Sequence, residues 1–208
     1  MSRAVSSTPL LVVITGPSGV GKSTLCDNIR LALPGVSRAV TCTTRKPRSG
    51  ELDGVDYYFL GEEEFLARVD SDEFLENASV HGNHYGVLKS ELRAKLEGGS
   101  DVLLNIDVQG AATIRERAAT DPVLSRSLLT VFLCPPSVKE LEYRLRGRGT
   151  DTNEAIEKRL TNAKDETAQA GKFDHMLTSQ TREADAGRLL GIIESVRLDK
   201  REAILTNE

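Results

Sequence analysis

The sequence predicts an α/β fold in which helices cover a mainly parallel β-sheet. Short apolar segments alternate with segments of helical periodicity along the chain, and this alternation is typical of parallel strands joined by helices. A glycine-rich loop at residues 16–23 separates the first apolar segment from the first helical one. With 208 residues, 39% of them hydrophobic, the chain is long enough for one such domain with small inserted lobes.

The glycine-rich loop reads GPSGVGKS, which fits the phosphate-binding pattern G-x-x-x-x-G-K-S. The β-branched run at 10–14 predicts a buried strand, and the spacing of Leu25, Ile29 and Leu33 predicts a helix. Backbone N–H groups of such a loop and the helix N-terminus bind phosphates. We therefore predict nucleoside triphosphate binding, with Lys22 on the β- and γ-phosphates and Ser23 as a Mg²⁺ ligand.

The sequence pattern of residues 39–100 predicts a mixture of short strands and short helices. A basic loop at 44–50 contains Arg45 and Arg48, and Gly98-Gly99 end the last helix. Between about residues 56 and 88 the strands are short and only one short helix is expected, so we predict a small lobe inserted into the parallel core. The predicted strands are 39–43, 56–60 and 74–86 (in two segments), and the predicted helices are 62–69 and 90–96.

The strand at 101–107 ends in Asp107, which has two interpretations. An aliphatic strand ending in Asp is typical of a carboxylate that holds Mg²⁺ directly or through water. Alternatively, Asp107 caps a helix, because a new segment begins at Val108. Position alone favours neither interpretation.

The remaining segments continue the alternation of strand and helix. Ser137 and Glu140 have the spacing of a capping box, which predicts the start of a helix. Strands are predicted at 128–133 and 176–177, and helices are predicted at 137–145, 151–170 and 183–198.

Arginines and one glutamate are further candidates for binding. Guanidinium groups bind phosphate oxygens bidentately, so Arg45, Arg48 and Arg148 are interpreted as phosphate-binding residues, with solvated surface arginines as the alternative. Glu76 interrupts an apolar strand. A carboxylate there would accept two hydrogen bonds from the N1–H and N2–H₂ edge of guanine, which adenine lacks, but Glu76 equally fits the solvent side of a strand.

The composition of the chain argues against several other classes of protein. The net charge of −4 argues against a general nucleic-acid-binding protein, and no apolar run approaches the roughly 20 residues of a membrane-spanning helix. Cys26, Cys42 and Cys134 are far apart, odd in number and without metal-binding spacing. We therefore expect reduced thiols in a cytoplasmic protein.

Taken together, the motifs resemble those of the guanylate kinases, which phosphorylate GMP with ATP. The resemblance covers roughly residues 10–200. The segments that carry it are GPSGVGKST (16–24), TTRKPRSGE (43–51), GVDYYF (54–59), FLENA (74–78), HGNHYG (81–86), IDVQGA (106–111), PPS (135–137) and residues 144–151. The segments at 43–51 and 81–86 are far more specific than the phosphate loop.

The resemblance implies a single domain over residues 1–208 with three parts: a three-layer α/β/α core (9–40, 91–134 and 166–208), a GMP-binding lobe (41–90) and a helical lid (135–165). It implies ATP, GMP and Mg²⁺ as ligands, with no nucleic-acid or membrane partner. The implied catalytic residues are Lys22, Arg45, Arg148 and Arg159. The implied ATP-binding residues are Gly16, Pro17, Ser18, Gly19, Val20, Gly21, Lys22, Ser23 and Thr24. The implied GMP-binding residues are Thr41, Arg45, Arg48, Tyr57, Glu76, Tyr85 and Asp107, and the implied metal ligands are Ser23 and Asp107, the latter through water.

Four positions depart from the family pattern: Thr41, Val87, Asn105 and Ser179. None of them removes a charged catalytic group, so we expect activity to be retained. Two other functions remain as alternatives. One is a different small-molecule kinase on the same scaffold, which would lack Glu76 and Tyr57. The other is a non-catalytic module that binds phosphopeptides, which would typically lack the phosphate loop.

Overall fold

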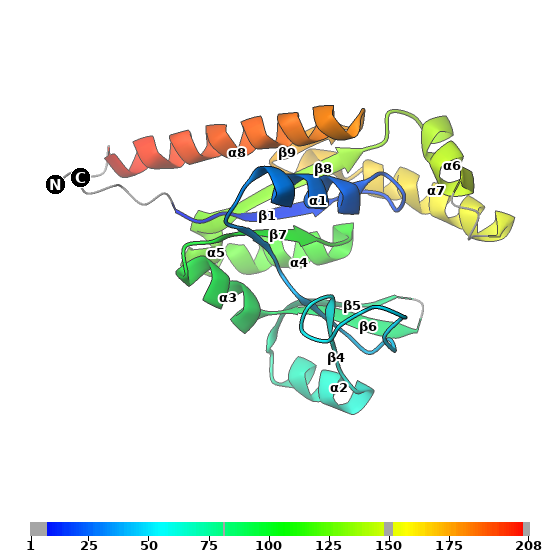
Figure 1. Cartoon of the computed structure of the whole chain (residues 1–208), viewed down its shortest axis with the longest axis horizontal. Helices are drawn as coiled ribbons and strands as arrows, with labels where there is room; N and C mark the ends of the chain where they lie inside the picture. Colours follow the sequence, from blue (N-terminus) through cyan, green and yellow to red (C-terminus); the bar gives the residue numbers. More distant parts are fainter. Residues whose placement is uncertain (1–7, 81, 148–151, 206–208) are drawn as a thin grey trace.

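The computed structural model describes residues 8–80, 82–147 and 152–205, with the backbone alone at 203–205. Its main sheet has five parallel strands in the order β2-β7-β1-β8-β9, which confirms the predicted α/β fold (Figure 1). The central strand β1 therefore lies between two strands that come much later in the chain. The strands are β1 (Leu11–Thr15), β2 (Val36–Arg38), β7 (Asp101–Asn105), β8 (Leu128–Cys134) and β9 (His175–Thr178).

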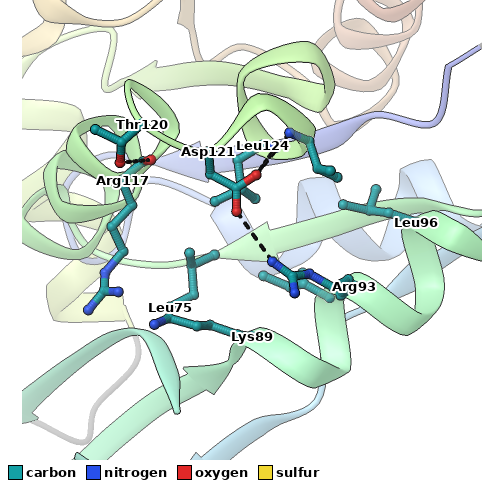
Figure 2. Close-up of a pocket in the computed structure, with 10 residues that line it drawn as sticks. Leu75, Lys89, Arg93, Leu96, Arg117, Thr120, Asp121 and Leu124 are labelled. Atoms are coloured by element: carbon teal, nitrogen blue, oxygen red, sulfur yellow. Dashed lines mark hydrogen bonds and ion pairs between the residues drawn. The ribbon is translucent and has the colours of Figure 1, made fainter. Parts of the chain in front are cut away.

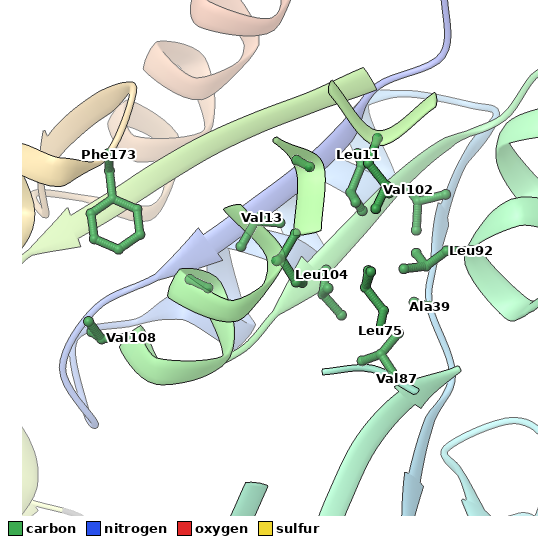
Figure 3. Close-up of a cluster of buried hydrophobic side chains, with 14 of the residues drawn as sticks. Leu11, Val13, Ala39, Leu75, Val87, Leu92, Val102, Leu104, Val108 and Phe173 are labelled. Atoms are coloured by element: carbon green, nitrogen blue, oxygen red, sulfur yellow. The ribbon is translucent and has the colours of Figure 1, made fainter. Parts of the chain in front are cut away.

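Helices cover both faces of this sheet because side chains along each buried strand alternate between the faces. On one face Val12 and Ile14 pack with Leu25 and Ile29 of α1. On the other face Leu11 belongs to the cluster drawn in Figure 3, which also holds helix residues of α3, α4 and α5. The helices on the first face are α1 (Lys22–Ala32) and α8 (Arg182–Leu205), and those on the second are α3 (Lys89–Glu97), α4 (Val108–Ala118) and α5 (Pro122–Ser127).

A second, four-stranded sheet has the order β4-β3-β6-β5 and lies apart from the main sheet (Figure 1). It has its own apolar cluster, in which the rings of Phe65 and Phe74 stack with centroids 4.5 Å apart. Leu75 and Val87 instead join the main cluster, so this sheet is anchored to the core through β5 and β6. Its elements are β3 (Thr41–Thr43), β4 (Tyr57–Phe59), α2 (Glu62–Asp70), β5 (Phe74–Val80) and β6 (Asn83–Leu88).

Two helices, α6 (Val138–Gly147) and α7 (Asn153–Thr167), pack together at one end of the molecule (Figure 1). Leu141, Leu145 and Ile156 form their shared cluster. The Glu140 N–H donates to Ser137 Oγ at 3.1 Å, as expected for the start of a capping box. A short 3₁₀ helix (Ala170–Lys172) leads from α7 to β9.

The structure differs from the sequence-based expectation at three places. The strand expected at 39–43 begins at Thr41, because the Ala39 N–H donates to Leu103 O and so still pairs with β7. Strand β2 was not expected, and neither was α5, whose N-cap Asp121 accepts N–H bonds from Val123 and Leu124. The three cysteines are buried and unpaired, as expected for reduced thiols.

Every helix within the described residues is too short or too polar to cross a membrane.

Candidate active site

A cavity of about 440 Å³ lies between the main sheet and the small sheet. The carboxyl ends of parallel strands bring their following loops to one edge of a sheet, where ligands bind in folds of this type. The predicted residues that line the cavity are Gly16, Ser18, Lys22 and Ser23 from the phosphate loop, Thr41, Tyr57, Glu76 and Tyr85 from the small sheet, and Asp107 after β7. Segments far apart in the sequence thus meet around one space.

The phosphate loop joins β1 to α1 in a conformation that requires glycine. Gly16 has a φ of 138°, and a Cβ there would lie 2.3 Å from the carbonyl oxygen of Leu133. A Cβ on Gly19 would lie 2.7 Å from the side chain of Leu145 on α6. The loop is therefore packed tightly between β8 and α6.

The polar side chains of the loop make contacts within the cavity. Lys22 Nζ donates to Gly16 O at 2.6 Å and to Pro17 O at 3.1 Å, so the ammonium group lies against its own loop. Asn105 Nδ2 donates to Ser23 Oγ at 3.1 Å. The amide of Asn105, the last residue of β7, is thus in contact with Ser23, one of the two predicted metal ligands.

A second space of about 350 Å³ lies on the other side of the loop and is lined by Gly19, Val20, Gly21 and Thr24. Arg144 from α6 closes one side. Its Nη1 donates to Val20 O and to Ser179 Oγ, each at 3.0 Å. Together the two spaces border every residue of the loop from Gly16 to Thr24 except Pro17. Pro17, the remaining residue of the predicted ATP-binding set, borders neither space but contributes its carbonyl oxygen to Lys22.

The basic loop after β3 holds Arg45 in a fixed position. Arg45 makes a bidentate pair with Glu51 at 2.9 and 3.0 Å, and its guanidinium lies 5.3 Å from the centroid of the Tyr57 ring. The hydrogen bonds to Glu51 raise the pKa of Arg45 further and lower the pKa of the Glu51 carboxyl. The rings of Tyr57 and Tyr85 meet edge to face at 6.3 Å. Arg48 is exposed, and its backbone contacts Glu51: its N–H donates to the Glu51 carboxylate at 2.7 Å, and its carbonyl oxygen accepts from the Glu51 N–H at 3.1 Å.

Glu76 is buried, with 5% of its surface exposed, and faces the cavity from β5. Burial and the neighbouring charge of Asp107 raise the pKa of Glu76 to about 7. A Cβ added to Gly110 of α4 would lie 2.7 Å from Glu76 Oε2, so the carboxyl group lies directly on this helix. The solvent-side alternative for Glu76 is therefore wrong.

Asp107 is the N-cap residue of α4, and its Oδ1 accepts the Gly110 N–H at 2.8 Å. The helix-cap interpretation is thus confirmed. The same carboxylate also lines the cavity, so its predicted roles toward guanine and Mg²⁺ stay predictions.

One of the two predicted lid arginines, Arg159, lies on α7. Arg159 on α7 donates from Nη1 to Ser18 Oγ at 3.3 Å, which connects this helix to the phosphate loop. Arg148 lies outside the described residues. The roles assigned to both arginines stay predictions.

Arg38 and Glu166 are among the further residues that line the cavity and were not sequence-based candidates. Arg38 ends β2 and lies with its guanidinium 5.9 Å from the centroid of the Tyr57 ring. Glu166 near the end of α7 has a raised pKa, mainly because it is buried, although the charge of Lys22 opposes the shift. Recognising β2 in the sequence would have placed Arg38 at the end of a strand, where site residues are expected. Glu166 is one of several acidic residues on a polar helix, and no sequence pattern distinguishes it from the others.

Comparisons with known proteins agree with this geometry. The family model described as guanylate kinase matches residues 8–196. A guanylate kinase of Bifidobacterium longum is 46% identical over 184 residues, which are 88% of this chain and 92% of the relative. A guanylate kinase of Fusobacterium nucleatum is 42% identical over 185 residues, which are 89% of this chain and 96% of the relative. The crystal structure of guanylate kinase from Anaplasma phagocytophilum aligns with a TM-score of 0.69 at 30% identity, covering 92% of this chain and 88% of that one. This chain belongs to the guanylate kinase family.

Proposed function

We propose that this chain transfers the γ-phosphoryl group of ATP to GMP and so forms ADP and GDP. The observation that carries the proposal is the buried carboxylate of Glu76 in the same cavity as Lys22 and the phosphate loop. A site built around a buried acceptor discriminates strongly against bases that leave it unpaired. Family membership supports the same reaction.

On the donor side, the loop N–H groups and the N-terminus of α1 hold the ATP phosphates. Lys22 moves from the carbonyl oxygens of its own loop to the β- and γ-phosphates. The space beside Arg144 and Ser179 has room for the base and sugar of ATP, since it borders the same loop on its other side. Little covalent chemistry is required of the protein, because positioning and charge neutralisation supply most of the rate of phosphoryl transfer.

On the acceptor side, the guanine N1–H and N2–H₂ groups donate to the Glu76 carboxylate, with Asp107 beside it. The GMP phosphate binds to Arg45 and Arg48 and accepts hydrogen bonds from the hydroxyl groups of Tyr57, Tyr85 and Thr41. Glu51 orients Arg45 through the bidentate pair. Because the Arg45 guanidinium is already ordered, less conformational entropy is lost when the phosphate binds.

The residues present fit a Mg²⁺ ion that is held mainly by substrate phosphates. Within the part of the chain that the structure describes, no group of three acidic, histidine or cysteine side chains could hold a metal alone. Mg²⁺ bound with nucleotides typically keeps several waters and takes one or two protein ligands. We propose that Ser23 is a direct ligand and Asp107 a ligand through water. If bound there, the ion would supply positive charge that offsets the negative charge developing on the phosphates during transfer.

We also propose that the chain divides into the core, the GMP-binding lobe (41–90) and the lid (135–165) expected from the sequence. The separate apolar clusters of the small sheet and of α6 with α7 support this division. Closure of both parts around the two substrates would exclude water, which otherwise competes with GMP as acceptor. Arg159 and Arg148 would then approach the transferring phosphoryl group.

The test is an ADP-release assay with ATP and Mg²⁺, in which GMP, AMP, CMP and UMP are offered separately. Turnover with GMP alone among the four supports the proposal. Equal turnover with several acceptors, or none with any of them while ATP still binds, contradicts it.

Because the pKa of Glu76 is raised to about 7, GMP should bind less tightly in acid. The free carboxyl group is protonated below this pKa, whereas guanine donors require its charged form. We therefore expect the Kd for GMP to rise by up to about tenfold per pH unit as pH falls below about 7. Equilibrium dialysis at pH 8, 7 and 6 measures this.

The control for the pH series is Glu76→Gln, which cannot titrate. The second ionisation of the GMP phosphate, near pH 6, contributes equally to both proteins. A pH dependence that is the same in the variant as in the wild type would rule out Glu76 as its source.

Gly110→Ala should weaken GMP binding without affecting ATP. The new Cβ would lie 2.7 Å from Glu76 Oε2 and 3.4 Å from Asp107 Oδ1, so the carboxyl group must shift. We expect KM for GMP to rise about tenfold, which corresponds to about 1.4 kcal/mol, with KM for ATP changed less than twofold. Gly191→Ala on α8 is the matched control, because a Cβ there meets nothing within 4 Å.

A further inference from the structure

A smaller cavity of about 230 Å³ lies away from the active site, at the seam between the small sheet and the core. Figure 2 shows it between α3, the end of α4 and the start of α5, with Leu75 of β5 at its base. It is smaller than the roughly 300–1,000 Å³ typical of pockets for drug-sized ligands. A ligand of one ring or two fused rings is therefore the largest that fits.

The base of this cavity is apolar, and its rim carries three cations and the carboxylate of Asp121. The buried side chains of Leu75, Leu92 and Leu124 form the base, and Lys89, Arg93 and Arg117 lie at the rim. Such a combination complements a molecule with an apolar body and one anionic group.

The three cations differ in how firmly they are held by acids. Asp72 accepts from Lys89 at 2.6 Å and from Arg117 at 2.8 Å. Arg93 pairs with Asp121 only at 3.5 Å, while Asp121 also accepts the Val123 and Leu124 N–H groups as the cap of α5. With 58% of its side chain exposed, Arg93 is the rim cation most easily taken over by an incoming anion.

The cavity is joined to the active site through adjacent residues of β5. Leu75 lines this cavity and Glu76 lines the active-site cavity, so the strand presents one residue to each. The pairing register of β5 with β6 shifts between Phe74 and Glu76, where such irregularities bend a strand and re-aim its side chains. A group that displaces Leu75 would therefore act on the strand segment that also carries Glu76.

We propose that this cavity binds a small aromatic carboxylate, with its ring on Leu75, Leu92 and Leu124 and its carboxylate on Arg93, and that binding changes the affinity of the active site for GMP. The second part rests on the proposed function, since it concerns the residue that reads guanine. The first part is independent of it.

The binding test uses 2-naphthoate as the probe and equilibrium dialysis against the full chain. Saturating ADP, Mg²⁺ and GMP are present so that the nucleotide sites are occupied. We expect a Kd on the order of 1 mM or tighter for a ligand of this size. Arg93→Met keeps much of the apolar stem and should weaken 2-naphthoate at least about fivefold, while uncharged 2-naphthamide should bind both proteins equally.

The matched control is Arg201→Met, an exposed arginine of α8 that does not line the cavity. It should bind 2-naphthoate as the wild type does. Failure of the wild-type chain to bind the probe, or equal binding by wild type and Arg93→Met, would overturn the site.

The kinetic test separates coupling from binding. At a saturating concentration, 2-naphthoate should change KM for GMP at least threefold and KM for ATP less than twofold, and Arg93→Met should lose this response. If 2-naphthoate binds but KM for GMP is unchanged, the proposed coupling is wrong and the proposed binding site stands. An enzyme that is inactive without any probe would instead contradict the proposed function, and the dialysis result would be unaffected.

Discussion

Lys22→Met should lower kcat for GMP phosphorylation by about 10²- to 10³-fold, the usual cost of removing one preorganised charged donor from the transition state. Lys22 is the cation of the phosphate loop and faces the cavity in which the phosphates are expected to meet. Methionine keeps much of the length and apolar character of the lysine stem. The loop itself should persist, because its shape depends on Gly16 and Gly19.

Steady-state kinetics with varied ATP and varied GMP measure this effect. The control is Lys139→Met, an exposed lysine on α6, which should keep wild-type kcat. A Lys22→Met protein with normal thermal unfolding and kcat within fivefold of the wild type would contradict the predicted role of this lysine.

Glu76→Ala should lower kcat/KM for GMP by about 10²- to 10⁴-fold and remove most of the preference for GMP over AMP. The substitution takes away the buried carboxylate that we propose as the acceptor for the guanine donors, which would then be left unpaired. Glu76→Gln should also lose activity, because its NH₂ group would meet a guanine donor. The ratio of kcat/KM values for GMP and AMP is the quantity to measure.

Stability distinguishes loss of recognition from loss of folding. The raised pKa of Glu76 means that its proton stabilises the folded chain, and that this contribution is lost as pH rises through about 7. Glu76→Gln removes the charge and should therefore unfold no more easily than the wild type at pH 8. Glu97→Gln, at an exposed position on α3, is the matched control. An unchanged preference for GMP in Glu76→Ala would show that another residue reads the base.

The phosphate loop was predictable because a local motif and its flanking strand and helix agree. Glu76 was predictable only as one of two alternatives, since a single strand does not reveal which face is covered. Packing of β5 against the glycine-containing turn of α4 decides this, and the contact joins residues more than thirty positions apart. The resemblance to known kinases favoured the same answer without showing the burial.

Strand β2 was missed for a related reason. It has three residues that are partly buried or exposed, and its pairing with β7 lies more than sixty residues away in the chain. Arg38 was missed with it. Short edge strands are defined by their pairing partner more than by their own sequence pattern. The residues that they bring to a site can therefore be identified only from the structure.

The burial of all three cysteines has a practical consequence. Loss of hydration raises the pKa of Cys26 and Cys42 to about 12 and also raises that of Cys134, so few thiolates form at neutral pH. The native chain should resist alkylation and peroxide. A pair of new surface cysteines, one at Glu63 on α2 and one at Ser195 on α8, could therefore carry fluorophores selectively. Energy transfer between them would test the proposed approach of the small sheet to the core during turnover, without first removing any native thiol.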